Sequence, residues 1–403
     1  MEQRVMAFAA ASRAAVTLIA LLTARLVTPY DTSTRLAAGS AGPYAAAFAN
    51  WDGVYFTQIA ARGYDYEQMH AFFPLYPLLM RALSNASFVL AALWLYRLGR
   101  LVLGDEAVAR RAAYLFCIAP SSIFMSAVYS ESFGGMLCLE RHKRSGRFSE
   151  LLLCAVAFGC ASATRSNGAL LSLFIAWHRL CASPPPRAAP AACLRHWAAT
   201  ALLGVVAVGP QVVYFGYGLS VYCPSLLPAA TTAASQAPSL LTGDRSWCAH
   251  AVPNLSAMYV FVQREYWNVG LFQYYELKQA PNFLLASPIV ALSAHSLLQF
   301  ARSAARPGEA RPGEAPYYAH WLFLLVNALL VVHIQVTTRL LCACPPLFWA
   351  PAAFAVREVS STGDRNAGTT VSKMSTKGAL VVGYFLLYTV LGSVLFPAFY
   401  PWT

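Results

Sequence analysis

The chain has 403 residues, of which 58% are hydrophobic and only 11% are charged, and its mean hydropathy is +0.50. A soluble globular protein carries about a quarter charged residues, so this composition excludes that class and indicates a polytopic membrane protein. The net charge of +12 raises the question of a nucleic-acid partner, which the placement of the basic residues answers below.

Apolar segments long enough, or nearly long enough, to span a bilayer recur along the whole chain. In lipid every backbone polar group must be satisfied internally, and these segments lack the alternation of barrel strands, so helices are expected. We predict an all-α polytopic bundle of about ten or eleven spans, with one doubtful segment at 131–140. The others lie at about 5–27, 86–103, 107–128, 148–164, 168–181, 197–219, 283–300, 317–337, 341–356 and 378–397.

Basic residues concentrate in alternate connections between these segments, as the positive-inside rule requires of cytosolic loops. A cytosolic N-terminus follows, and with eleven spans the C-terminal residues 397–403 end on the opposite face. The basicity therefore reports topology, and no nucleic-acid partner is expected. The basic connections are Arg97–Arg111, Arg141–Arg147, Arg179–Arg195, Arg302–Arg311 and Arg357–Lys377.

The N-terminal apolar run is too long for the core of a cleaved signal peptide and is interrupted by Arg13, so we expect a retained first span. Most of the ten cysteines lie in predicted spans, where a thiol is a small hydrophobic group. Cys223 and Cys248 lie instead in a long non-cytosolic loop, where a disulfide is permitted, and the sequence leaves their bonding open. Asn85 and Asn254 each begin an N-x-S sequon, and Asn85 is expected to lie too close to a span for modification.

Two long loops, 29–85 and 220–282, fall on the non-cytosolic face of a single integral membrane domain covering 1–403. The stretch at 51–77, WDGVYFTQIAARGYDYEQMHAFFPLYP, concentrates ionisable and aromatic side chains beside a span, which makes it the expected catalytic loop. Asp52 is flanked by Trp51 and other aromatic residues at the membrane edge. Partial desolvation there makes a carboxylate a better general base toward a sugar hydroxyl.

This stretch resembles the signature of the PIG-V family, the GPI mannosyltransferase 2 enzymes. The shared features are a Trp-Asp pair, then F-x-x-I-A-x-x-G-Y, then A-F-F-P-x-x-P. Further agreeing blocks, in the family's order, are Tyr129–Glu131, Thr164–Gly168, Trp247–Cys248, Tyr266–Gly270, Leu277–Leu284 and Gln335–Arg339.

The resemblance implies a C-type glycosyltransferase fold in the endoplasmic reticulum membrane, with the active site facing the lumen. It implies transfer of the second mannose, in α1,6 linkage, from dolichyl-phosphate-mannose to the growing glycosylphosphatidylinositol (GPI) glycolipid. The lumenal site agrees with the topology argued from the basic connections. No cofactor is expected, and the sequence does not decide whether a small accessory membrane subunit takes part.

Within this resemblance, Asp52 is the predicted catalytic base and Trp51 a neighbouring substrate contact. Glu131 is expected to orient the acceptor or bind its glucosamine ammonium, with a helix-end charge as the alternative. Arg165, with Asn167 beside it, is predicted to hold the donor phosphate, because a guanidinium matches a phosphate bidentately. A structural pair with an acid is the alternative for Arg165.

Further predicted substrate contacts lie later in the chain. Lys278 and Gln279 are candidates for phosphate or sugar contacts, and Arg339 is a third, with a snorkelling interfacial anchor as its alternative. Trp267 and Asn268 complete the substrate-binding set, although an interfacial aromatic belt also accounts for a tryptophan at this position.

No metal site is predicted. Asp65 and Glu67 form a D-x-E pair, but two carboxylates alone rarely make a cation site, and a lipid phosphate leaves without needing a metal. His70 and His333 are expected to be hydrogen-bonding residues rather than metal ligands.

Two other functions remain open at this point. A different dolichyl-phosphate-sugar-dependent glycosyltransferase would keep Asp52 but need not keep the blocks at 267–268 and 278–283. A lipid or solute transporter would place ionisable residues near mid-membrane on paired broken helices, whereas most of those here lie at span ends on one face.

Overall fold

The computed structural model describes residues 1–30, 47–48, 50–127, 133–226, 245–251, 254–309, 311–360, 370–400 and 402. Helices make up almost all the regular structure of this part of the chain, which confirms the all-α prediction apart from one hairpin. In chain order the elements are α1 (Glu2–Leu26), α4 (Asp52–Arg62), η1 (Glu67–Ala71), α5 (Leu75–Leu103), α6 (Glu106–Cys117), α7 (Ser122–Ala127), α8 (Gly134–Ser145), α9 (Phe148–Thr164), η2 (Ser166–Leu171), α10 (Ser172–Cys181), α11 (Pro190–Tyr222), η3 (Pro224–Leu226), η5 (Ser246–His250), α12 (Ala257–Glu265), η6 (Leu277–Gln279), α13 (Ala280–Ala304), α14 (Ala315–Leu330), η7 (Ile334–Val336), α15 (Thr337–Leu341), α16 (Pro346–Phe354), β1 (Val356–Ser360), β2 (Thr370–Met374) and α17 (Thr376–Leu395).

Each predicted apolar segment contains a helix, and the doubtful one at 131–140 overlaps α8. Within the described ranges, five helical stretches are long and apolar enough to cross a bilayer: α1, the part of α5 from Asn85, α11, η6 with α13, and α17. The helices α9 and α14 are shorter apolar helices. These features establish a multi-pass membrane protein.

Three predicted spans are interrupted; in the one at 317–337 the long helix α14 ends at Leu330, and a short turn, η7, follows from Ile334. The segment at 107–128 divides into α6 and α7 on either side of Pro120, and the segment at 168–181 divides into η2 and α10. Proline has no backbone N–H to continue the helical ladder, so it breaks the span at 107–128. Capping side chains mark other boundaries: Asp105 accepts a hydrogen bond from the Val108 N–H at the start of α6.

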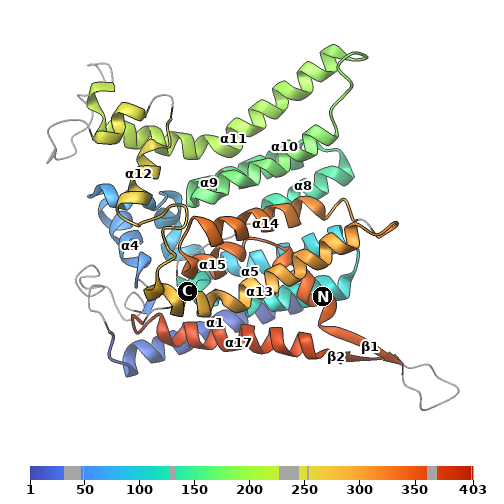
Figure 1. Cartoon of the computed structure of the whole chain (residues 1–403). Coiled ribbons are helices and arrows are strands. Elements are labelled where there is room, and N and C mark those ends of the chain that lie inside the picture. Colours follow the sequence, from blue (N-terminus) through green and yellow to red (C-terminus); the bar gives the residue numbers. More distant parts are fainter. Residues whose placement is uncertain are drawn as a thin grey trace.

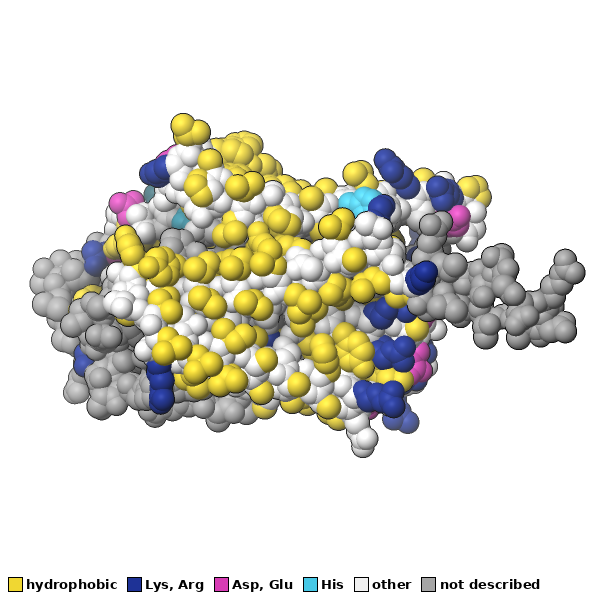
Figure 2. Space-filling view, turned by 90° about the horizontal axis from the view of Figure 1, so that it is seen from below, with side chains coloured by type: hydrophobic (Ala, Val, Ile, Leu, Met, Phe, Trp, Pro, Cys, Tyr) yellow, Lys and Arg dark blue, Asp and Glu magenta, His cyan; other side chains and the backbone are white. Residues whose placement is uncertain are grey.

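The long helices run side by side, with the N-terminus and β1–β2 toward one end of the bundle and α4 and α12 toward the other (Figure 1). Figure 2 shows hydrophobic side chains spread over one lateral face and Lys and Arg side chains gathered at the end that carries the N-terminus. Large apolar side chains that a bilayer would cover point outward along the helices, among them Leu153, Leu202, Val213, Leu284 and Leu380.

One feature was not expected from the sequence. The basic connection at 357–377 includes an antiparallel hairpin in which Val356 of β1 pairs with Met374 of β2. Both strands contain β-branched residues in their sequences, VREVS and TVSKM, which favour an extended backbone.

Cys223 and Cys248 form a disulfide, with their Cα atoms 5.7 Å apart. The bond joins the end of α11 to η5 and lies in a small apolar cluster with Tyr222 and Trp247. The bridge that the sequence only permitted is therefore present, at the end of the bundle where α4 and α12 lie.

Candidate active site

Asp52 and Arg339 form an ion pair at the end of the bundle that carries α4. Arg339 Nη1 of α15 lies 2.9 Å from Asp52 Oδ2, although the two residues are 287 positions apart in the chain. Asp52 is the first residue of α4, where the helix dipole favours a negative charge. The Arg339 guanidinium also lies over the ring of Phe124 from α7, with its Cζ atom 4.6 Å from the centroid. Arg339 is thus brought to the predicted base.

The backbone that presents Asp52 is held by Asn50, which sequence analysis did not single out. Its buried side-chain amide donates to the carbonyl oxygens of Phe396 (3.0 Å) and Pro397 (2.9 Å), at the end of α17. Trp51 follows with a positive φ of 55° and packs against Phe399, the ring centroids 5.6 Å apart. The end of α17 therefore fixes the turn that starts α4.

A cavity of about 630 Å³ opens beside this ion pair. Asp52, Arg165 and Asn167 all line it, so the structure brings together the predicted base and the predicted phosphate-binding pair. Its other lining residues include the aromatic Phe56, Phe72, Phe73, Tyr259 and Phe323 and the amides Gln263 and Asn327. The cavity has the composition expected for a sugar-phosphate: a carboxylate, a guanidinium, amides and apolar walls.

Arg165 reaches the cavity because α9 ends there. Its backbone is extended (φ −151°, ψ 145°), and the Gly168 N–H donates to the Arg165 carbonyl at 3.0 Å, which starts η2. A Cβ at Gly168 would collide with the backbone of α9 at Ala161, so only glycine permits this close return of the chain. The Thr164–Gly168 block therefore combines residues that line the cavity with a glycine that the close packing against α9 requires.

Trp267 and Asn268 border the site from the second long loop. The Trp267 ring meets Tyr55 and Phe72 edge-on, each at 5.6 Å between centroids. Asn268 has a positive φ of 50°, and the chain then turns so that Val269 and Gly270 line the cavity. The backbone N–H of Gly270 donates to the Val331 carbonyl at 3.1 Å, which docks this turn on the end of α14. Neither predicted residue lines the cavity itself; both shape its rim.

Two neighbouring groups have shifted pKa values. Burial, followed by the charge of Asp52, raises the pKa of the Tyr55 phenol above its usual value. Burial lowers the pKa of His333, while hydrogen bonds to the backbone of Trp267 and Asn268 oppose that shift. His333 also stacks on Tyr274, with ring centroids 4.5 Å apart. Both groups are therefore neutral near pH 7.

The structure does not bring the remaining predicted residues into this cavity. Lys278 is exposed and pairs with Glu276, Nζ to Oε2 at 2.5 Å. Gln279 accepts a hydrogen bond from Asn282 at 2.7 Å at the start of α13, and neither residue is among the lining side chains. Glu131 lies outside the described residues.

Asp65 and Glu67 point to different partners rather than to a shared cation. Asp65 accepts from Gln58 Nε2 at 3.0 Å. The buried Glu67 accepts from Trp247 Nε1 and from the Tyr266 hydroxyl, both at 2.9 Å. Among the described residues no group of three or more His, Cys, Asp or Glu could hold a metal ion. Glu67 instead joins the first long loop to the second.

His70 has the hydrogen-bonding role that the sequence predicted. It is fully buried, stacks on Tyr64 at 4.3 Å and lies 3.3 Å from the Tyr214 hydroxyl through Nδ1. Burial lowers its pKa to about 4. The imidazole is therefore neutral at physiological pH.

Sequence analysis missed Gln263, which is part of the polar end of α12, and Asn327, which is a lone amide in the apolar helix α14. Asn327 had a signal that could have identified it, since an amide inside the apolar helix α14 is costly unless it faces a cavity or a partner. Tyr259 and Gln263, on the inner side of α12, carried no comparable signal.

These features define a multi-pass helical membrane protein with a charged, aromatic-walled cavity at one end of its bundle. The chain belongs to the Mannosyltransferase (PIG-V) family, whose sequence profile matches residues 2–86, 79–308 and 311–403. It is therefore a glycosyltransferase, as its motifs indicated.

Curated relatives agree over most of their length. The chain is 31% identical to GPI alpha-1,6-mannosyltransferase 2 of Cricetulus griseus, covering 88% of this chain and 87% of that protein. It is 32% identical to the Mus musculus protein of the same name, with the same coverage. It is 31% identical to GPI mannosyltransferase 2 of Drosophila pseudoobscura pseudoobscura, covering 88% and 86%.

Among solved structures, the archaeal oligosaccharyltransferase AglB from Archaeoglobus fulgidus, in complex with an inhibitory peptide and a dolichol-phosphate, aligns with 98% of this chain and 56% of that chain. The TM-score is 0.45 and the sequence identity 12%.

Proposed function

We propose that this protein transfers mannose from dolichyl-phosphate-mannose to the GPI glycolipid precursor, adding the second mannose in α1,6 linkage. The observation that carries the proposal is the single cavity lined by Asp52, Arg165 and Asn167. The names of the relatives support the choice of donor sugar, acceptor and linkage. A transferase with another acceptor is distinguished by the product of the assay below.

In the proposed reaction Asp52 accepts the proton of the attacking acceptor hydroxyl as its oxygen bonds to the anomeric carbon of mannose. The bond from that carbon to the phosphate oxygen breaks, and dolichyl phosphate leaves with the electron pair. Arg165 binds this phosphate bidentately, and Asn167 donates hydrogen bonds beside it. Arg339 keeps the carboxylate of Asp52 oriented through their 2.9 Å contact. No step requires a metal.

The remaining predicted residues have surrounding roles in this proposal. Trp267 presents an apolar face at the rim to a sugar ring, the exposed Trp51 beside Asp52 offers a second one, and Asn268 turns the chain that carries Val269 and Gly270. Lys278 and Gln279 lie near the start of α13, where an incoming lipid headgroup would be met. Glu131 is proposed to contact the acceptor.

We further propose a C-type fold forming one domain in the endoplasmic reticulum membrane, with a cytosolic N-terminus and a lumenal cavity. The gathering of basic side chains at the end opposite to α4 supports this orientation (Figure 2). The Cys223–Cys248 disulfide lies at the cavity end, and such bonds persist in the oxidising lumen.

Glycosylation tests the orientation. Asn254 is exposed just before α12, whereas Asn85 lies within α5 and lines a groove against α1. A glycan removed by endoglycosidase and abolished by Asn254→Gln, but not by Asn85→Gln, is expected. An unmodified Asn254 together with a modified cytosolic-end tag would contradict a lumenal cavity.

The test of the reaction is complementation of a cell lacking the second GPI mannosyltransferase, scored by surface GPI-anchored protein and by the accumulated glycolipid. Wild type is expected to restore anchors, and Asp52→Asn to leave the one-mannose intermediate, because loss of a general base costs about 10²- to 10⁴-fold in rate. Asp65→Asn is the matched control, an acid of the same loop that does not line the cavity.

If well-expressed wild type fails to restore anchors, the assigned acceptor is wrong, unless adding a small accessory membrane subunit restores transfer. Assaying the purified chain with donor and acceptor alone decides whether that subunit is needed. Full activity of Asp52→Asn would show that Asp52 is not the base, and Glu131→Gln would then be tested.

A further inference from the structure

The interruption between α6 and α7 leaves the backbone carbonyls of Cys117 and Ile118 outside the helical hydrogen-bond ladder, whereas that of Ala119 accepts from the Ser122 N–H at 2.8 Å. Residues 118–121 separate the two helices, and Pro120 offers no N–H. Irregular backbone at membrane depth is tolerated only where other protein groups satisfy it. The groups that do so here come from two distant helices.

From α1, Arg13 donates to the Ser122 carbonyl at 2.6 Å and to the Cys117 carbonyl at 3.4 Å, and also bonds the Ser122 hydroxyl. From α17, the Thr389 hydroxyl lies 2.9 Å from the Ile118 carbonyl and 3.1 Å from that of Ala119. Together they occupy the carbonyls on both sides of the break.

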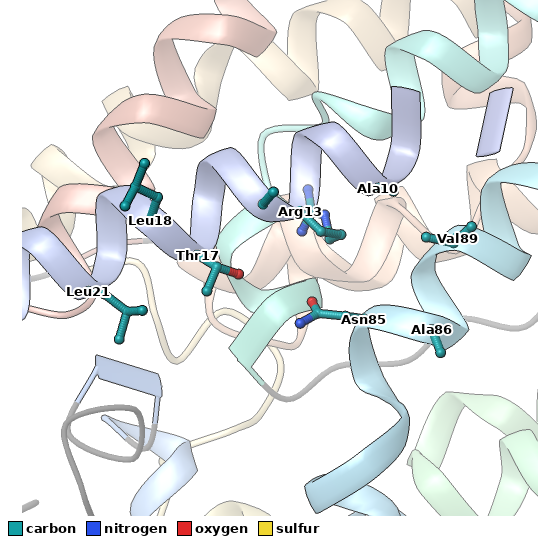
Figure 3. Close-up of a pocket in the computed structure, with 9 residues that line it drawn as sticks. Ala10, Arg13, Thr17, Leu18, Leu21, Asn85, Ala86 and Val89 are labelled. Atoms are coloured by element: carbon teal, nitrogen blue, oxygen red, sulfur yellow. The ribbon is translucent and has the colours of Figure 1, made fainter. Parts of the chain in front are cut away.

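Arg13 is 3% exposed, and its guanidinium lies over the Phe88 ring, with Cζ 3.7 Å from the centroid. Figure 3 shows Arg13 beside the groove of about 590 Å³ between α1 and α5, with Asn85 on the facing helix. An ionisable side chain this deep in a first span is costly and calls for a function. Its hydrogen bonds indicate that this function is to hold the start of α7.

The position of α7 matters because this short helix reaches the proposed active site. Phe124, two residues after Ser122, lies beneath the Arg339 guanidinium at 4.6 Å, and its ring meets Phe396 edge-on at 5.5 Å. Arg339 in turn contacts Asp52 at 2.9 Å. A continuous set of contacts therefore runs from Arg13 through Ser122 and Phe124 to the carboxylate.

We propose that Arg13 is a positioning residue of the transferase, which fixes the broken span so that Phe124 holds Arg339 against Asp52. This proposal rests on the proposed function. Thr389 fixes the other side of the same break. Because Arg13 does not line the cavity that holds Arg165 and Asn167, its loss should slow the chemical step more than it weakens donor binding.

The test measures kcat and KM for dolichyl-phosphate-mannose in membranes containing equal amounts of each variant. Arg13→Gln and Phe124→Leu are each expected to lower kcat by about 2- to 30-fold, the range for coupling through packed residues, with KM for the donor little changed. The double variant should lose no more than the worse single variant, because both act through α7. Arg25→Gln, at the exposed end of α1, is the matched arginine control.

Thr389→Val keeps the test decisive if Arg13→Gln does not fold, since it removes only one hydroxyl from the break; Thr389→Ser should restore the activity. Normal kcat in folded Arg13→Gln or Thr389→Val would overturn the proposal, as would losses that multiply in the double variant. Wild type serves as the reference in the same assay. If wild type transfers no mannose even with the accessory subunit added, the proposed function fails. If wild type transfers mannose and the variants match it, only this inference fails.

Discussion

Replacing Glu67 by leucine should release η5 from the first long loop. The buried Trp247 Nε1–H then loses the carboxylate that accepts it at 2.9 Å, and an unsatisfied buried donor costs about 1–3 kcal/mol. The half-exposed Tyr266 hydroxyl can turn to water, so its loss adds little. Arg245, 3.6 Å from Glu67 and partly exposed, adds less than about 1 kcal/mol. The sum is about 2 kcal/mol.

Hydrogen exchange measures this change directly. A local loss of about 2 kcal/mol corresponds to roughly 30-fold faster exchange in peptides covering η5 and α12. Glu67→Gln should cost less, because its carbonyl oxygen still accepts from Trp247. Trp247→Phe removes the same bond from the other side, so the double variant should fall short of the summed losses. Unchanged exchange in Glu67→Leu, or fully additive losses, would refute the reasoning.

Three further outcomes are expected. Burial lowers the pKa of His70 to about 4, so the folded state binds a proton at this imidazole less readily than the unfolded chain does. The stability present above a pH of about 6.5 should therefore fall toward pH 4 by up to about 1.4 kcal/mol per pH unit. A melting temperature that falls equally with pH in His70→Phe would contradict this role of His70. Gly168→Ala should disrupt the return of η2 onto α9 and lower activity, whereas Gly204→Ala, with open space around its Cα, should not; equal activities of the two variants would argue against the steric role. Cys248→Ser should increase proteolysis of the loop after α11 by removing the bond to Cys223, and an unchanged cleavage rate would show that the surrounding cluster suffices.

Much of the architecture could be predicted from local pattern. Within the described residues the apolar segments identified all five helical stretches long enough to cross a bilayer, because a span must satisfy its own backbone and carry an apolar surface whatever its neighbours are. The alternation of basic connections matches the gathering of Lys and Arg at one end (Figure 2). Residue chemistry and motif resemblance singled out Asp52, Arg165 and Asn167 as candidates, and the fold places all three around one cavity.

Local pattern was less informative where a side chain's role depends on a distant partner. From the sequence, Glu67 was one of two carboxylates in a weak cation-binding motif. In the structure it accepts hydrogen bonds from Trp247 and Tyr266. Arg339 read as an interfacial anchor or a phosphate contact, and the structure pairs it with Asp52. Arg13 served only to argue against a signal peptide.

The sequence by itself determined the membrane class, the helices and the family, because hydrophobic length and contiguous motifs are properties of neighbouring residues. Only the tertiary structure decided the Asp52–Arg339 pair, the Glu67 contacts between loops and the satisfaction of the α6–α7 break. In each case the partners lie more than a hundred residues apart. A buried charge or an interrupted helix must find its partner wherever packing brings one, and packing is set by the whole chain.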